Sequence, residues 1–163
     1  MLRLILMRHA KSSWRDESLS DHERPLNKRG REDAPRVAAR IKKLGWTPQL
    51  IFSSDSQRTK ETLELMRPEF DSSPEVKFTR DLYLADIEAV REFCRDLPKT
   101  TETIMMLGHN PGWEEAVPWL SKAPTRMTTS NAALMQCNFE WYASVEEAGR
   151  WDLVDVIRPK DLD

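Results

Sequence analysis

The chain has 163 residues, a length typical of one domain that buries a core without metals or disulfides. Charged residues make up 32% and the net charge is −2, which argues against bulk binding of nucleic acid or an anionic membrane. Apolar runs are short, as at 4–7, and the start lacks a small-residue cleavage site, so neither a spanning helix nor a signal peptide is expected. These features predict a single-domain monomer over 1–163, cytoplasmic, with Cys94 and Cys137 as buried reduced thiols.

Charge is distributed unevenly along the chain. Residues 1–50 hold twelve Lys and Arg against six Asp and Glu, whereas residues 51–163 hold thirteen against twenty-one. A basic stretch is more often a solvated helix face than a binding site. An anion site, if present, should nevertheless draw on the first third of the chain.

The first elements in chain order are a strand, a long loop and a helix. Residues 2–7 are almost continuously apolar, as in a strand covered on both faces, and the polar stretch 11–25 follows. Apolar residues then recur at helical spacing from Asn27 to Leu44, and Gly45 suits the stop. Pro35 requires either a helix that begins near Asp33 or a kink.

The remaining pattern keeps alternating between strand and helix. We expect a strand over 49–53, a helix capped by Asp55 or Ser54 and ending at Pro68, a strand over 76–79, a helix over 87–97, a strand over 103–107, a helix over 111–120, and two paired strands over 133–143 and 151–157. This order predicts a three-layer α/β/α sandwich with a mostly parallel central sheet and an antiparallel edge.

Basic side chains follow three of the predicted strands. Arg8 and His9 follow the first strand, Arg58 lies in the first turn after the second, and His109 follows the fourth. Ligands of open α/β sheets bind outside the carboxyl ends of the strands, and guanidinium forks match a tetrahedral oxyanion. Taken singly, each residue is better explained as a turn, a helix surface or a packed histidine. Their coincidence at one rim predicts a phosphate site.

Four blocks carry a resemblance to a known family. They are Met7-Arg8-His9-Ala10, Arg24-Pro25-Leu26 followed by Gly30, Ser53-Ser54-Asp55 followed by Arg58-Thr59 and Thr62, and Gly108-His109-Asn110. In order and spacing the chain resembles the histidine phosphatase superfamily, with its phosphoglycerate-mutase-like fold, over roughly 2–120. The short length, the RHAKS start, residues 81–85 and GHNPG are similar to small SixA-type phosphohistidine phosphatases. Ala10 replaces the Gly of the family pattern and leaves that loop less free to adopt positive φ.

The resemblance implies that His9 is the nucleophile and becomes phosphorylated. Arg8, Arg58 and His109 would then hold the phosphoryl group and stabilise its charge, with His109 expected to be protonated. No carboxylate cluster suited to Mg²⁺ or Mn²⁺ accompanies these motifs, so we expect neither metal nor cofactor. The expected substrate is a phosphorylated protein carrying phosphohistidine, or a small phosphate ester.

A strong general acid is missing from the motifs. Asn110, not Asp, follows His109, and Asp86 is a weak candidate that is better explained as a helix cap. A departing imidazole, with a conjugate acid of pKa about 6.5, needs such an acid far less than an alkoxide does. The sequence therefore favours phosphohistidine over phosphomonoesters.

Several residues near the nucleophile have less certain roles. Lys11 and Ser12 either reach the phosphate or form loop surface. Arg24 is expected to order the loop against the site. Trp14 and Trp113 either flank the entrance or pack in the core.

Three alternatives accompany the phosphohistidine phosphatase hypothesis. The first is a broad phosphomonoesterase of the same fold. The second is a phosphate-binding module with little turnover, although arginines alone would suffice for binding. The third is a metal site formed by His9, His22 and His109, which is disfavoured because these residues lack any short ligand spacing.

Overall fold

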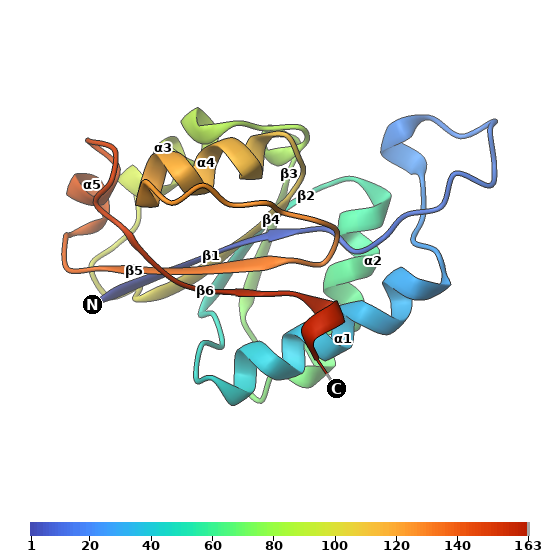
Figure 1. Ribbon diagram of the computed structural model, residues 1–163, viewed down its shortest axis with the longest axis horizontal. Helices are drawn as coiled ribbons and strands as arrows, with labels where there is room; N and C mark the ends of the chain where they lie inside the picture. The colour runs from blue at the N-terminus through green and yellow to red at the C-terminus, as the bar shows by residue number, and fades with distance from the viewer. Residues whose placement is uncertain (163) are drawn as a thin grey trace.

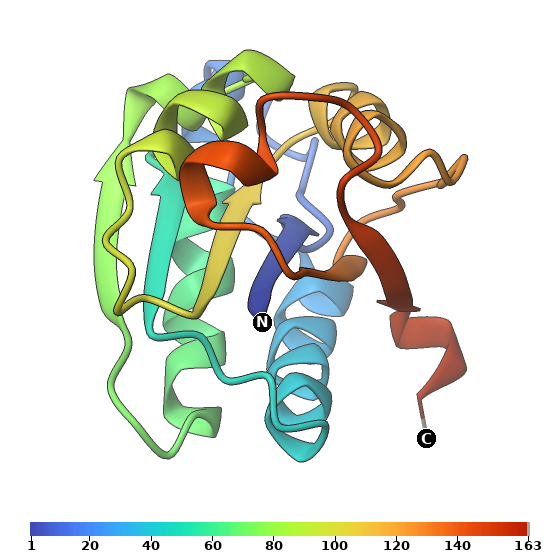
Figure 2. The ribbon, with the colours of Figure 1, turned by 90° about the vertical axis from the view of Figure 1, so that its left-hand side faces the viewer.

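The protein is described by a computed structural model that covers residues 1–162. Its centre is one six-stranded sheet, flanked by helices on both faces (Figures 1 and 2). The strands are β1 (Leu2–Arg8), β2 (Leu50–Ser54), β3 (Glu75–Thr79), β4 (Thr103–Gly108), β5 (Ala132–Cys137) and β6 (Asp152–Ile157). The helices are α1 (Lys28–Lys43), α2 (Gln57–Met66), α3 (Ile87–Arg95), α4 (Gly112–Ser121) and the single turn α5 (Trp141–Ser144). The predicted sandwich is confirmed.

Alternation along β1 divides the core into two layers. Leu4 and Leu6 pack with α3, α4 and α5, whereas Ile5 and Met7 pack with α1 and α2 on the opposite face. All four side chains are fully buried. Because both faces are covered, the strand has a continuous apolar sequence, as strands buried on both faces do.

The sheet order, β3-β2-β4-β1-β5-β6, brings three functional strand ends together. Strand β4 lies between β1 and β2 and is parallel to both. The register pairs Arg8 with Gly108 and Ser53 with Leu107, so the chain leaves all three strands at one level. The segments that carry His9, Arg58 and His109 therefore emerge side by side.

Strands β5 and β6 complete the sheet on the other side. β5 runs antiparallel to β1 and to β6, as expected of an antiparallel addition. The predicted strand over 133–143 is too long, because β5 ends at Cys137 and residues 141–144 form α5. The α5 turn allows the Trp141 ring to be buried in the core.

The predicted helix from Asn27 to Leu44 is confirmed, but one of its two alternative starts is excluded and the predicted caps of the next helix are wrong. Helix α1 begins at Lys28 with Asn27 as its cap, and Pro35 lies inside it, so the alternative start near Asp33 is excluded. The cap of α2 is Ser56, whose side chain accepts from the Thr59 amide, and not Asp55 or Ser54. Neither predicted cap is available, because Ser54 is the last residue of β2 and the Asp55 carboxylate binds His22.

The thiols of Cys94 and Cys137 are free and buried, as predicted. In residues 1–162, helices long and apolar enough to cross a bilayer are absent.

The first turn of α1 supports the loop that follows β1. The Asn27 amide donates to the Lys11 carbonyl at 3.0 Å, and Ser12 forms a bridge with Leu26. A β-carbon added at Gly30 would lie 2.9 Å from the Lys11 nitrogen and closer still to the Lys11 carbonyl oxygen. Glycine at this position therefore allows helix and loop to touch.

We predict that Gly30→Ala destabilises the protein, because neither backbone segment yields easily. The loss in unfolding free energy should be about 1–3 kcal/mol, despite the better helix propensity of alanine, and urea unfolding measures it. Amide exchange should rise at residues 9–12. Gly45→Ala is the matched control: it costs about 1–2 kcal/mol because φ is 79°, but it has open space and should leave that loop protected. Unchanged exchange at 9–12 in Gly30→Ala would contradict the proposed support.

Candidate active site

His9 is a neutral imidazole whose Nε2 atom carries a lone pair. Its Nδ1 lies 2.7 Å from the Ala10 carbonyl oxygen, which only accepts, so Nδ1 holds the proton. The Arg58 Nε then donates to Nε2 at 3.3 Å. Backbone hydrogen bonds to Gly108 and Ser130 fix the residue, which is 5% exposed. The residue thus presents a nucleophilic nitrogen in a fixed direction.

Ala10 fits the position where the family pattern has glycine. Residues of the described chain with positive φ, glycine aside, are Leu84, Lys122 and Ser130, so Ala10 is not strained. Its amide donates to the Thr62 hydroxyl at 3.0 Å.

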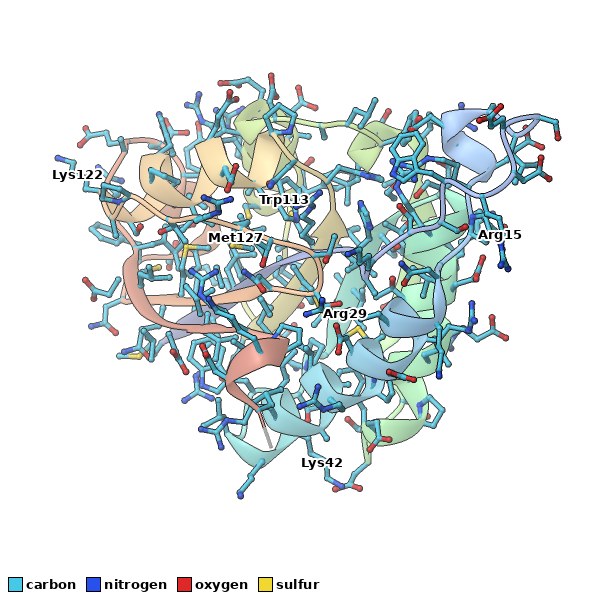
Figure 3. All side chains as sticks on the ribbon, turned by 45° about the vertical axis from the view of Figure 1, so that its right-hand side comes forward. Arg15, Arg29, Lys42, Trp113, Lys122 and Met127 are labelled. Atoms are coloured by element: carbon cyan, nitrogen blue, oxygen red, sulfur yellow. The ribbon has the colours of Figure 1, made fainter. Side chains whose placement is uncertain are left out.

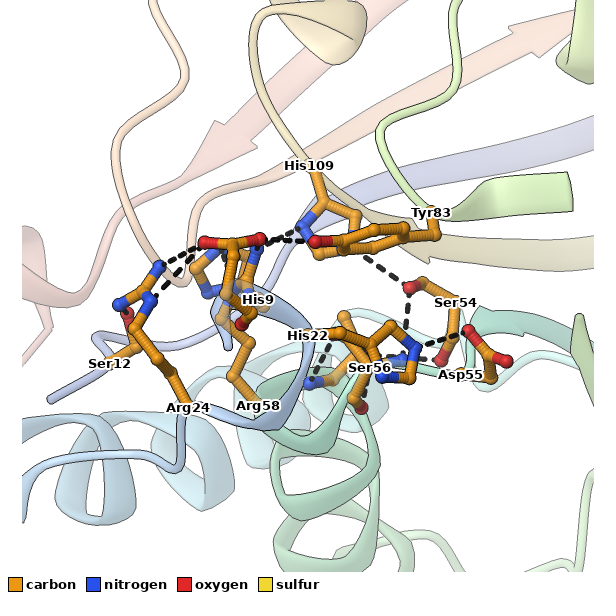
Figure 4. A network of polar contacts seen from close by, with 12 residues as sticks. His9, Ser12, His22, Arg24, Ser54, Asp55, Ser56, Arg58, Tyr83 and His109 are labelled. Carbon is orange, nitrogen blue, oxygen red and sulfur yellow. Dashed lines mark hydrogen bonds and ion pairs between the residues drawn. The ribbon is translucent and has the colours of Figure 1, made fainter. Parts of the chain in front are cut away.

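His109 is held as the opposite tautomer. Its Nδ1 accepts from the Arg58 Nη2 at 3.3 Å, and its Nε2 therefore carries a proton, which it donates to the Ser54 hydroxyl at 2.8 Å. The ring centroids of His9 and His109 are 5.2 Å apart. The two imidazoles, drawn from β1 and β4, share one guanidinium between them (Figure 4).

Both histidines have lowered pKa values. Burial is the largest cause for each, and nearby Arg58 and Arg8 add to it. The pKa of His9 lies well below 6.5, and that of His109 falls to about 3. The expectation of a protonated His109 is therefore wrong for the free protein, because a buried imidazole between two guanidiniums does not accept a further positive charge.

Arg58 is buried, with 2% of its surface exposed, which excludes the solvated-surface interpretation. Besides the two imidazoles it binds Asp21, donating from Nη1 to the carbonyl oxygen at 2.7 Å and from Nη2 to the carboxylate at 3.1 Å. This pairing compensates a buried charge that would otherwise be costly.

Asp21 also binds Arg24 and Tyr83. Arg24 donates from Nε and Nη2 at 3.2 and 3.1 Å, and the Tyr83 hydroxyl donates to the other carboxylate oxygen. Burial alone would raise the pKa of Asp21, but the hydrogen bonds from Tyr83 and Arg24 and the charge of Arg58 hold it far below its ordinary value. Asp21 is therefore a carboxylate anion in the free protein.

Arg8 approaches the site from the β1 end. Its Nη1 donates to the Met127 carbonyl at 3.1 Å, an oxygen that also accepts from the Asn110 side chain at 2.6 Å. The Arg8 Nε atom is buried without a partner. One donor of this guanidinium thus remains unused.

These groups line one cavity of about 410 Å³. Its walls are formed by Arg8, His9, Lys11, Ser12, Trp14, Asp21, Arg24, Arg58, Leu84, His109, Asn110 and Thr129. The predicted nucleophile His9 and the three residues predicted to hold the phosphoryl group, Arg8, Arg58 and His109, are therefore brought together. A larger hollow of about 550 Å³ lies between α1 and β6, but histidine is absent from its lining and its Arg36 donates to the Pro159 and Leu162 carbonyls.

The rim residues divide into loop supports and core. Arg24 donates to the Ser12 hydroxyl at 2.6 Å and orders the loop, as expected. Its guanidinium lies 3.5 Å from the ring centroid of Trp14, which lines the cavity. Trp113, in the first turn of α4, is in contrast fully buried (Figure 3), and its indole donates to the Met7 carbonyl of β1 at 2.8 Å. Only Trp14 flanks the entrance.

The weaker candidates are engaged elsewhere. The Asp86 carboxylate accepts from the Glu88 amide at 3.0 Å as the cap of α3, the role expected of it. His22 binds Asp55 at 2.8 Å, and Asp55 also receives the Arg80 guanidinium. His22 is not among the cavity residues, which removes it from a shared site with His9 and His109.

Sequence reasoning missed Asp21 and Tyr83. The sequence pattern places Asp21 only within the long loop 11–25, although its spacing of three residues before Arg24 allows an ion pair. Tyr83 lies in the segment 81–85 of the family resemblance, which by itself assigns it no role. Its ring meets the His109 ring edge-on, with centroids 5.3 Å apart.

The lowered histidine pKa values predict that the free energy of unfolding decreases as pH falls below 6.5. The unfolded chain binds protons near pH 6.5 while the folded chain keeps both imidazoles neutral, so unfolding becomes easier as pH drops below 6.5. Each group should contribute up to about 1.4 kcal/mol per pH unit. Urea unfolding from pH 7 to 5 measures the slope, and His109→Asn should make it shallower. NMR signals of His9 and His109 that titrate near pH 6.5 in the folded protein would contradict the assignment.

Comparison with known proteins identifies the family and the fold of this chain. The family model of the histidine phosphatase superfamily (branch 1) matches residues 4–103. An uncharacterised chloroplastic protein of Arabidopsis thaliana is 43% identical over 169 residues, covering 96% of this chain and 78% of its own.

Solved structures show the same fold. The protein histidine phosphatase SixA in complex with tungstate is 19% identical, with a TM-score of 0.85 over 99% of this chain and 100% of that one. A structure from Agrobacterium tumefaciens assigned to the phosphohistidine phosphatase SixA is 24% identical, with a TM-score of 0.81 over 97% and 98%. The matched residues and the shared fold together show that this chain belongs to the histidine phosphatase superfamily.

Proposed function

We propose that the protein is a phosphohistidine phosphatase that hydrolyses its substrate through a phosphorylated His9. Membership of the superfamily supports a phosphatase. The single observation that carries the covalent route is the His9 tautomer: Nδ1 is protonated against the Ala10 carbonyl, which leaves the Nε2 lone pair facing the Arg58 Nε at 3.3 Å in a cavity lined by arginines. A neutral, buried imidazole of this kind is a competent nucleophile at neutral pH.

The first step transfers the phosphoryl group to His9. The Nε2 lone pair forms a bond to phosphorus, and the bond from phosphorus to the substrate nitrogen breaks, leaving its electron pair on that nitrogen. The substrate ring carries a proton on its other nitrogen, so it departs as neutral imidazole. Arg8 and Arg58 stabilise the charge on the three equatorial oxygens. The unused Arg8 Nε is one donor available to them.

The second step hydrolyses the intermediate. Water attacks phosphorus, the bond to the His9 Nε2 breaks, and the electron pair returns to that nitrogen, while the water protons remain with phosphate and solvent. The proton stays on Nδ1, which donates it in a hydrogen bond to the Ala10 carbonyl throughout. His9 therefore leaves each cycle in the tautomer in which it began.

Neither carboxylate considered as a proton donor suits that role, which favours a substrate whose leaving group needs no general acid. The low pKa of Asp21 makes it a poor proton donor, and Asp86 is used as a helix cap. An alkoxide leaving group needs a proton that neither carboxyl group can supply, whereas an imidazole leaves without one. Phosphohistidine is favoured over a sugar phosphate or phosphoserine.

His9→Ala should lower turnover of a phosphohistidine peptide by at least about 1000-fold, because the nucleophile is lost. Arg58→Ala should lower kcat by about 100–1000-fold, as expected for a lost donor to the transferring group. Quenching without acid should trap a phosphoryl group on wild-type His9 by mass spectrometry. His22→Ala, which removes the histidine outside the cavity, is the matched control and should keep most activity. Full activity in His9→Ala would exclude the covalent route.

Relative rates on two substrates test the leaving-group argument. We expect kcat/KM for a phosphohistidine peptide to exceed that for an alkyl phosphate by at least about 100-fold, the scale of one missing acid catalyst. Similar rates on the two substrates would instead support the broad phosphomonoesterase.

We also propose that the reaction needs no metal. Within residues 1–162, clusters of three or more His, Cys, Asp or Glu able to hold an ion are absent, and the arginines carry the charge that a metal would carry. Activity measured after dialysis against EDTA should equal that of the untreated protein. Loss of activity that added Mg²⁺ restores would contradict this.

The remaining proposals concern the whole protein. One sheet that contains all six strands supports a single domain over residues 1–163. A monomer and a cytoplasmic location stay predictions, and the Arabidopsis relative is named as chloroplastic.

A further inference from the structure

We propose that Trp14 and Leu84 form an apolar rim that packs against the imidazole ring of a phosphohistidine on a protein substrate. This inference rests on the proposed function and assigns residues for substrate selection at the same cavity. Both side chains line the cavity together with His9 and His109. They come from separate segments, the loop after β1 and the turn before α3.

The depth of the reacting groups determines where the leaving group lies. His9 and His109 are only 5% and 2% exposed, so the phosphoryl group must descend to the cavity floor. In-line transfer places the leaving group opposite the His9 Nε2, toward the cavity mouth. The ring that carried the phosphoryl group therefore meets the rim and not the floor.

Trp14 is exposed and yet held in place. Its side chain is 73% exposed, the largest fraction among the exposed large hydrophobic residues. The Arg24 guanidinium lies over its ring at 3.5 Å, and Arg24 is itself tied to Ser12 and Asp21. An indole fixed in this way offers a flat surface to a second ring at low entropic cost.

Leu84 is held in an unfavourable backbone conformation. Its φ of 55° is in the left-handed region, which leucine rarely adopts, and its side chain is 56% exposed. The preceding Tyr83 is anchored by its hydroxyl to Asp21. Strain of this kind at a cavity mouth is typical of a residue that serves a ligand.

The chemistry of floor and rim together identifies the occupant. The floor carries the buried Arg58 and the part-buried Arg8, and Lys11 adds positive charge to the wall, which complements a phosphoryl dianion. The rim adds apolar surface that a flat imidazole and the residues beside it would cover. An unadorned phosphoramidate has the same scissile bond to nitrogen but presents nothing to Trp14 or Leu84.

The test compares two substrates across matched variants. Trp14→Ala removes the ring, and Leu84→Asn removes the apolar chain while keeping a residue that tolerates positive φ. Tyr142→Ala is the control for an exposed aromatic residue, and Lys122→Asn is the control for a left-handed position, since φ is 59° there. The substrates are a phosphohistidine peptide and phosphoramidate, and urea midpoints verify that each variant is folded.

We expect kcat/KM for the peptide to fall about tenfold in Trp14→Ala and in Leu84→Asn, while phosphoramidate hydrolysis changes less than about twofold. Both control variants should match wild type on both substrates. Equal losses on the two substrates, or none on either, would overturn the rim. If wild type cleaves neither substrate and no phosphoryl group is trapped on His9, the proposed function itself fails. That result differs from failure of the rim alone, in which wild type is active and the rim variants keep its activity on the peptide.

Discussion

The buried guanidinium of Arg58 is the constraint on which the site depends. It donates to both imidazoles and to Asp21, so one planar group sets the direction of three partners. Removing the cation would leave the Asp21 carboxylate without one of its charge partners and would remove one of the two hydrogen bonds that hold each ring. The arrangement is preorganised because the charge and its partners are fixed before any anion arrives.

The same constraint explains the charge state of the two histidines. A phosphate site built from arginine and histidine suggests a cluster of positive charges, and that inference misled the expectation for His109. In the folded protein the guanidiniums take the charge and the imidazoles remain neutral, because burial disfavours a second cation beside Arg58. Arginine keeps its charge at any physiological pH, so the neutral partner has to be histidine.

Much of the fold and the meeting of four residues were predictable from sequence. Continuous apolar strands such as 4–7 and helical spacing such as 34–44 are strong periodic signals, and the basic residues stand at strand ends where parallel topology brings them together. Asp21 was not predictable in this way, because its position depends on how a fifteen-residue loop folds back, a matter of tertiary contacts and not of periodicity. The helix inside 133–143 was missed for a related reason: packing of Trp141 outweighed its strand propensity.

With the His9 nitrogen as the proposed nucleophile, the buried thiols bear on how this protein tolerates oxidants. Burial raises the pKa of Cys94 and of Cys137, so neither forms thiolate readily, and thiolate is the form that peroxide attacks. An enzyme that relies on a cysteine nucleophile loses activity under oxidative stress. A chain of this design should continue to work when such enzymes have stopped.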